Sequence, residues 1–447
     1  MIGLLVGLVA GSLGTGIALL ALGRHTRLAS RVGKVSSLCL AALSPLLLLQ
    51  AGDGTSARVG WIPETETAAL TLRAPGVYLA IMAFGALALA QTWRAEPFFP
   101  ENGARYWSAL AHLLCSLVVV ALTVDQFLAR YIVLELVALC TMVVLALGIP
   151  GLRHGLQLWS RYAQLRLGDI GLIVTILLLW RASGTFLIEE MLARATFLSP
   201  REQIPILLGG LLAVWAKMGL PPLHGWVVDS ALLPWQARVW AAGAALPLLG
   251  AYLLYRLRPL LLALGATPLL TVGGVVILVW ASAKLLRSGP RPGGSSWWFI
   301  GHSAVGLLLA GTQSMSAFLL TFLPIRVVLC LAGARAPRRV KWTWEADGKG
   351  ALAGLDALVR AARTIERHLL EAGNRRLAEG VKALSRLTAS ALEGRILEGL
   401  NRGGVRLARS IGRTLQDVHV GRLRRNLLWA SLGVIAVVAF TIAAFTR

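Results

Sequence analysis

Long apolar runs alternate with short polar segments along most of this chain. Several runs reach 18 or more residues with few charges, which is typical of helices that cross a membrane. The pattern predicts an all-α, polytopic transmembrane helix bundle with about 12 spans. We expect these spans at residues 2–22, 36–51, 76–93, 105–123, 128–149, 168–183, 203–219, 232–256, 262–284, 296–311, 314–334 and 427–446.

The stretch from 207 to 256 departs from the simple alternation of spans and loops. An apolar helix carries Lys217 and is followed by the pair Pro221-Pro222, then by a short amphipathic turn with His224 and Asp229. A lysine in hydrocarbon costs about 2.5–3.5 kcal/mol on insertion scales. Broken backbone at membrane depth is tolerated where protein or a wet cavity covers it. A charge beside a broken helix therefore indicates an ion path.

The segment between the eleventh and twelfth spans has a different pattern. Residues 334–426 hold twenty Lys and Arg against nine Asp and Glu, and leucines recur at helical spacing opposite the charges. This periodicity predicts a long amphipathic lateral helix in the membrane interface or along partner subunits. The alternative is a solvated basic tail. We expect three parts: the bundle at 1–334, the lateral segment at 335–426 and a C-terminal transmembrane helix at 427–447.

Composition supports a membrane protein and the charges predict its orientation. The chain is 56% hydrophobic and 15% charged, with a formal net charge of +23. The cations gather in alternate loops, which is typical of membrane orientation and anionic lipids rather than of nucleic acid. Positive-inside counting predicts an outer N-terminus and a cytoplasmic basic segment in a bacterial inner membrane. The cations counted are Arg24, Arg27, Arg31, Lys34, Arg153, Arg161, Arg166, Arg287 and Arg291.

The sequence contains no pattern of a soluble catalytic domain. Nucleotide-binding, metalloprotease, kinase and nucleophile-elbow motifs are missing, so we expect no catalytic centre and no cofactor. The four cysteines lie in apolar runs without metal-ligand spacing, so we expect small buried side chains and no metal site. They are Cys39, Cys115, Cys140 and Cys330.

Two charged residues in neighbouring spans are the main candidates for a proton path. Glu135 is the single carboxylate of its apolar run, and Lys217 lies near the cytoplasmic end of its own span. A carboxylate and an ammonium on adjacent helices lower each other's burial cost, and a buried lysine deprotonates readily. The pair is either a switchable proton site or a static ion pair that joins two helices. Residue spacing does not decide between them.

Other polar residues in or near spans have supporting roles. We expect Asp169 to cap the start of its helix, with pairing to Arg166 as the alternative. His224 is either a relay towards Lys217 or an interfacial histidine bonded to a backbone carbonyl. Lys284 is expected to snorkel. His302 is expected to contact another helix, and Arg326 to hold a fixed charge.

Four stretches resemble the antiporter-like membrane subunits of complex I, the Mrp antiporters and the membrane-bound hydrogenases. FLARYIVLELVALCTMVVLAL resembles the family helix that bears a glutamate, and AQLRLGDIGLIVTILLLW resembles the start of the next. WAKMGLPPLHGWVVDSALLP resembles the family's lysine segment and carries Lys217, Pro222, Leu223, His224, Trp226 and Asp229. TFLPIRVVLCLAGA resembles a later helix, with Arg326 at its lysine.

The resemblance implies a subunit that moves protons in step with electron transfer in partner subunits, with Glu135 and Lys217 as the key pair. This chain departs from the family at Ala242 and Phe322, which replace relay residues of the family, and about three of the family's helices are missing. The departures favour a scaffold subunit; the retained pair favours transport by a proton (or Na+) half-channel. A membrane partner in an inorganic-carbon uptake complex is a third reading. Other membrane subunits, peripheral redox subunits and anionic lipids are the expected partners.

Overall fold

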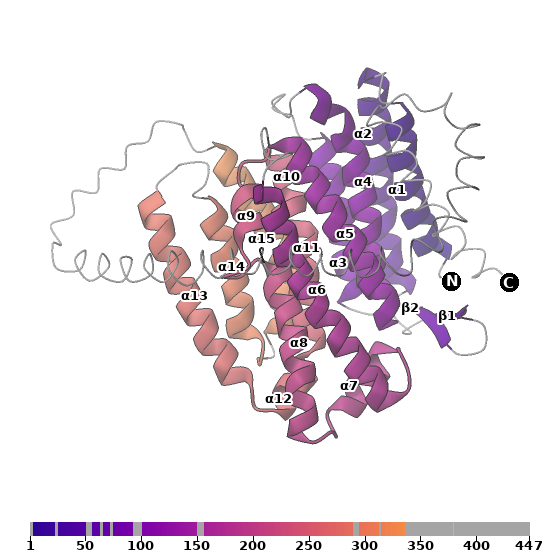
Figure 1. Ribbon diagram of the computed structural model, residues 1–447. Coiled ribbons are helices and arrows are strands. Elements are labelled where there is room, and N and C mark those ends of the chain that lie inside the picture. The colour runs from indigo at the N-terminus through magenta and orange to yellow at the C-terminus, as the bar shows by residue number, and fades with distance from the viewer. Residues whose placement is uncertain are drawn as a thin grey trace, which may run out of the picture.

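The computed structural model describes residues 3–22, 26–50, 56–62, 66–71, 75–92, 101–149, 156–288, 295–312, 314–335 and Glu379. Within these ranges the chain is a bundle of helices with one small hairpin (Figure 1). The expected lateral helix and C-terminal transmembrane helix fall outside the described residues, apart from that one glutamate.

Helices account for most of the described chain. They are α1 Gly3–Ala21, α2 Thr26–Leu43, η1 Ser44–Gln50, α3 Gly76–Thr92, α4 Glu101–Thr123, α5 Phe127–Gly148, α6 Leu156–Ser183, α7 Ile188–Ala195, α8 Pro200–Met218, α9 Gly225–Ser230, α10 Trp235–Val239, η3 Trp240–Ala244, α11 Leu246–Arg256, α12 Arg258–Ala263, α13 Thr267–Ser288, α14 Ser295–Leu309 and α15 Met315–Arg335.

One element is not helical and was not expected. Strands β1 Ser56–Ile62 and β2 Glu66–Thr71 form an antiparallel pair between η1 and α3. The all-α class therefore describes the bundle, and the connection between the second and third spans adds a two-stranded ribbon to it.

Seven of the described helical segments are long and apolar enough to cross a membrane, and three shorter apolar helices accompany them. The expected span at 203–219, which is α8 here, is not among these ten helices, and α13 starts five residues later than expected. The other positions agree with the expected spans except at two starts. The second begins about ten residues earlier, at Thr26, and the sixth about twelve earlier, at Leu156. Both starts carry arginines that the hydropathy pattern assigned to loops. The arginines lie in helix because helix formation follows backbone bonding and packing rather than hydropathy alone.

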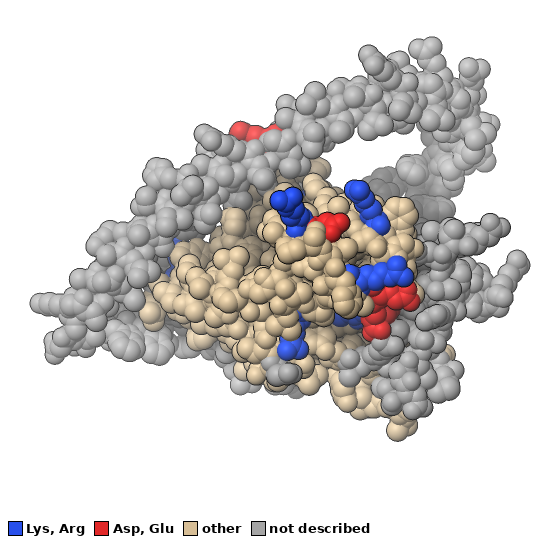
Figure 2. Space-filling view, turned by 90° about the horizontal axis from the view of Figure 1, so that it is seen from below, with Lys and Arg blue, Asp and Glu red and all other residues tan. Residues whose placement is uncertain are grey.

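The helices of the bundle stand side by side, and α6 and α8, which carry the candidate site described below, lie near its centre. Figure 1 shows α1, α2 and α4 at one side, α13 and α14 at the other, and α6, α8 and α11 between them. Its largest apolar core runs through α3, α4, α5, α8 and α11. The end of the bundle that carries α7 and α12 shows both charge signs on a mainly tan surface (Figure 2).

Cysteine burial is more varied than expected. Cys115 and Cys330 are buried, and Cys140 is partly buried, but Cys39 is exposed on α2. The expectation of four buried cysteines is therefore wrong at Cys39, because an apolar run predicts a membrane helix and not which of its faces is covered by protein.

Candidate functional site

Close packing of α6 against α8 brings two buried charges together. A Cβ on Gly168 would lie 2.4 Å from the Cβ of Ala216, and one on Gly171 would lie 2.6 Å from the carbonyl oxygen of Gly209. Only glycine allows the two backbones to come this close. The contact sets Asp169, next to Gly168, beside Lys217, next to Ala216.

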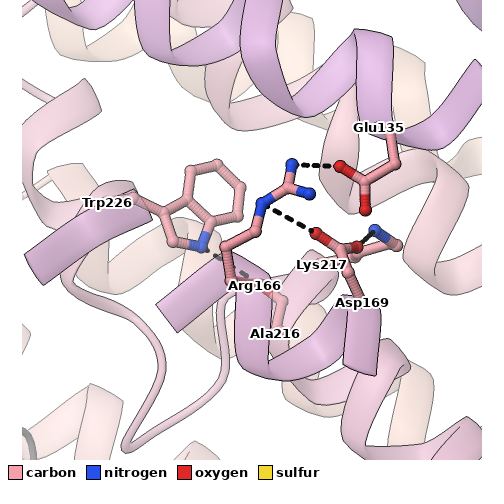
Figure 3. A network of polar contacts seen from close by, with 6 residues as sticks. All are labelled: Glu135, Arg166, Asp169, Ala216, Lys217 and Trp226. Atoms are coloured by element: carbon pink, nitrogen blue, oxygen red, sulfur yellow. Dashed lines mark hydrogen bonds and ion pairs between the residues drawn. The ribbon is translucent and has the colours of Figure 1, made fainter. Parts of the chain in front are cut away.

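Four charged residues of alternating sign form a continuous line across α5, α6 and α8 (Figure 3). Lys217 Nζ lies 2.6 Å from Asp169 Oδ1, and Arg166 Nε lies 3.7 Å from Asp169 Oδ2. The Arg166 guanidinium also forms an ion pair with Glu135. Arg166 therefore stands between the two carboxylates and joins them into one network.

The two ends of this line differ in exposure. The side chains of Lys217 and Asp169 are 1% and 2% exposed, whereas those of Glu135 and Arg166 are 15% and 25% exposed. The line thus begins at the surface of the bundle, near α5, and ends in its interior, at the last turn of α8. A cation at that turn also interacts favourably with the helix dipole.

Two expectations for these residues are corrected by the structure. Asp169 does not cap a helix start, because α6 begins at Leu156 and Asp169 lies well inside it. Lys217 lies on Asp169 rather than on Glu135. Glu135 pairs with Arg166 instead, a residue that the charge count placed in a loop. The alternative for Asp169, pairing with Arg166, is confirmed, because residues three apart share one face of a helix.

Carbonyl groups at the end of α8 and in the break after it accept hydrogen bonds from side chains. Helix α8 stops at Gly219, which has φ 65°, before the cis Pro221-Pro222 bond. The Trp226 indole donates to the Ala216 carbonyl at 3.1 Å, and the Trp215 indole donates to Pro221 at 2.6 Å. Ser303 Oγ donates to the Met218 carbonyl at 3.0 Å. Tryptophan and serine thus take over bonds that the broken helix leaves open.

Helix α9 is held against α6 by a second polar contact. Arg161 Nε lies 2.7 Å from Asp229 Oδ2. The Gln164 side chain accepts a hydrogen bond from the Gly225 backbone at 3.2 Å. Asp229 therefore fixes the short helix after the proline break, and Pro222 lies within the break itself.

His224 lies in the connection between α8 and α9 and packs against aromatic residues of α13 and α14. Its ring lies 5.3 Å from Trp280 and 5.9 Å from Trp297, and Lys284 Nζ stands over both tryptophans. Burial lowers the pKa of His224 to about 4, aided by the positive charges of Arg161 and Lys284. His224 is therefore neutral near pH 7. Among the described residues, no hydrogen bond or ion pair joins it to Lys217, whose partner is Asp169.

Arg326 lies in a separate buried group on α15. Its guanidinium donates to the Ala242 carbonyl at 3.0 Å, to Ser303 Oγ at 2.6 Å and to His302 Nδ1 at 3.1 Å. The Ala242 carbonyl belongs to η3, a π-helical turn that interrupts the eighth expected span. The ring of Phe322 lies 4.9 Å from that of His302. Ser303 was not recognised in the sequence, where a lone serine in an apolar helix carries no signal.

The geometry can be set beside known proteins. Residues 124–326 match the family model described as the transmembrane domain of NADH:quinone oxidoreductase and the Mrp antiporter. This part of the chain is similar to the antiporter-like membrane subunits of the complex I family. The matched residues contain the whole line of charges, from α5 to α8, and end at Arg326.

Curated proteins are similar to this chain over part of their length. Subunit 5 of the chloroplast NAD(P)H-quinone oxidoreductase from Ipomoea purpurea is 26% identical over 49% of this chain and 32% of its own length. Subunit L of the NADH-quinone oxidoreductase from Escherichia coli K12 is 26% identical over 42% of this chain and 32% of its own length. The aligned region thus spans about a third of these relatives.

Solved structures share the fold of this chain. The Mrp complex from Dietzia sp. DQ12-45-1b has a chain with a TM-score of 0.64 and 15% identity, covering 72% of this chain and 37% of that one. The membrane-bound sulfane sulfur reductase, an archaeal respiratory complex, has one with a TM-score of 0.61 and 16% identity, covering 73% and 70%. Both neighbours belong to multisubunit membrane complexes.

Proposed function

We propose that this subunit supplies a proton half-channel to a complex I-like respiratory or hydrogenase assembly. The observation that best supports this proposal is the line of alternating charges from the partly exposed Glu135 to the buried Lys217. A lysine in a dry interior is a suitable proton carrier because its ammonium gives up a proton when a partner charge withdraws. Na+ is the alternative ion.

Arg166 is the element that makes the line switchable in this proposal. Its guanidinium lies between Glu135 and Asp169, and its side chain is the most exposed of the four. A shift of Arg166 towards Asp169 would compensate that carboxylate and weaken its hold on Lys217. A shift towards Glu135 would leave Asp169 to Lys217. Charge changes in a neighbouring subunit near Glu135 would bias the two arrangements.

The same proposal includes the architecture that the sequence pattern predicts around the site. In it the chain has about 12 spans, a basic lateral helix at 335–426 that contacts anionic lipids, and a C-terminal transmembrane helix at 427–447. The N-terminus lies outside a bacterial inner membrane. Peripheral redox subunits, but no nucleic acid, complete the set of partners. His224, Trp226, Asp229 and His302 support the path by position rather than by carrying protons.

The test is proton pumping in vesicles that contain the assembled complex. Lys217→Ala and Glu135→Ala should each reduce pumping strongly while the complex still assembles, because each removes one end of the charge line. Lys34→Ala is the matched control, since Lys34 is an exposed lysine of α2 far from the line in sequence. Normal pumping by assembled Lys217→Ala complexes would refute the half-channel.

A scaffold role is the second candidate and one observation favours it. The inner side of the site has apolar residues at Ala242 and Phe322, both fully buried, where a continuing path needs polar groups. A scaffold subunit would tolerate Lys217→Met with unchanged pumping, and would lose assembly instead when the helix packing is disturbed.

A further inference from the structure

Arg326 is a buried cation without a carboxylate partner in the described part of the chain. It is 1% exposed, and the ion pairs found among the described residues involve other cations. Its neighbours are neutral acceptors and the rings of Phe299 and Phe322, 5.1 Å and 4.9 Å from the guanidinium carbon. Isolated buried charges are costly, so a retained one marks a constraint.

The hydrogen bonds of Arg326 lead back to the end of α8. The guanidinium donates to Ser303 Oγ, and the Ser303 hydroxyl donates to the carbonyl of Met218, the residue after Lys217. In both of these hydrogen bonds the donor lies on the Arg326 side and the acceptor on the side of α8. An arginine keeps its protons throughout the physiological range, so the direction of these bonds cannot reverse by proton release.

The same guanidinium fixes the state of His302. Arg326 Nε donates to His302 Nδ1 at 3.1 Å, so that nitrogen must be an acceptor and the neutral ring carries its proton on Nε2. A histidine relays protons when one nitrogen can accept while the other releases. With Nδ1 held by a permanent donor, His302 has no free nitrogen on the side facing Arg326.

We propose that Arg326 is the stop of the proton path: a fixed positive charge that bars proton transfer beyond Lys217. This inference rests on the proposed half-channel and specifies its inner end. A proton that reaches Lys217 then leaves by the way it came or towards a neighbouring subunit, but does not cross this chain. Arg326 acts through Ser303 and His302, and is a positioning residue rather than a carrier.

Passive proton flux through the purified full chain tests the stop. The chain is reconstituted in liposomes that hold a pH-sensitive dye, and a potassium diffusion potential drives protons. Liposomes with the wild-type chain should show no proton flux above that of empty liposomes. Arg326→Lys combined with Phe322→His provides a titratable amine and a second imidazole beside His302. This double variant should conduct protons several-fold faster, and Lys217→Met added to it should abolish the gain.

A structural role alone predicts a different pattern. If Arg326 only pins α15 to η3, its replacement loosens the fold, and any leak is insensitive to Lys217. Arg326→Gln is a second variant that keeps amide donors but removes the charge, and it should also show Lys217-dependent flux. The proposed stop would be overturned if the folded variants conducted protons no faster than the wild type. It would also be overturned if the wild type itself showed proton flux that depends on Lys217. Loss of pumping in the Lys217→Ala complex is a separate measurement and tests the half-channel instead.

Discussion

The buried pair of Asp169 and Lys217 gives a quantitative prediction for the free energy of unfolding. Both side chains are at most 2% exposed and their charged atoms are 2.6 Å apart. Asp169→Asn leaves the ammonium of Lys217 in the interior without a carboxylate. Lys217→Met leaves the carboxylate with Arg166 as a second partner, 3.7 Å away, so it should cost less.

The magnitude follows from the cost of an unpaired buried charge. Removing one member of a buried ion pair typically destabilises a protein by about 3–5 kcal/mol, whereas replacing both members is often neutral. We expect Asp169→Asn to cost about 3 kcal/mol or more, on the same grounds. The variant with both changes should then recover at least about 2 kcal/mol of that loss, which is a large coupling between neighbours.

Equilibrium unfolding of the purified full chain in mixed micelles measures all three variants against wild type. Glu190→Gln is the matched control, because Glu190 is an exposed carboxylate of α7 and should change stability by less than about 0.5 kcal/mol. Additive effects, with the double variant as unstable as the sum of the singles, would show that the two charges do not interact. The assignment of Lys217 to Asp169 would then be wrong.

Three further predictions concern the surroundings of that pair. Gly168→Val should separate α6 from α8 and lower both stability and pumping, while Gly85→Ala, with open space around it, should be neutral or slightly stabilising in the same unfolding assay. Trp226→Phe should cost about 0.5–1.5 kcal/mol on unfolding, because the Ala216 carbonyl loses the indole donor and keeps only the Gly219 amide, 3.3 Å away; a cost near zero would show that the indole bond adds nothing to stability. Burial keeps the pKa of His224 at about 4, below the unfolded value of 6.5, so stability should fall as pH drops from 6.5 towards 4, by up to about 3 kcal/mol. His224→Gln should remove that part of the pH dependence, and an unchanged profile would contradict the neutral assignment.

The bundle was accessible from sequence because apolar length predicts membrane helices almost directly. The spans at α1, α3, α4, α5 and α15 begin and end within a few residues of their expected limits, apart from α4, which starts four residues earlier. The start of α6 was misjudged because Arg161 and Arg166 raise its polarity. Both arginines find partners on other helices, and hydropathy contains no information about such partners.

The sequence identified Glu135 and Lys217 as residues of the candidate site, but it did not identify their ion-pair partners. A carboxylate and a lysine in apolar runs stand out by their cost, so Glu135 and Lys217 were found. Which carboxylate holds Lys217 depends on the approach of α6 to α8 at Gly168, a feature of the packed structure. The hairpin was missed for a related reason, since its short strands lie in a segment read as a polar loop.

The charge balance of the line explains how one proton could act at a distance. Glu135, Arg166, Asp169 and Lys217 sum to zero when all are ionised, so each charge is compensated by its neighbour. In the proposed half-channel, loss of a proton from Lys217 would leave Asp169 to Arg166 and draw the guanidinium away from Glu135. The change would then appear at the exposed end of the line, where another subunit could respond. Since interactions in low dielectric remain strong over several ångströms, the protein needs no large movement to pass on the state of Lys217. Arg326, which cannot change its charge, gives that signal a single direction, outward along the line rather than onward through the bundle.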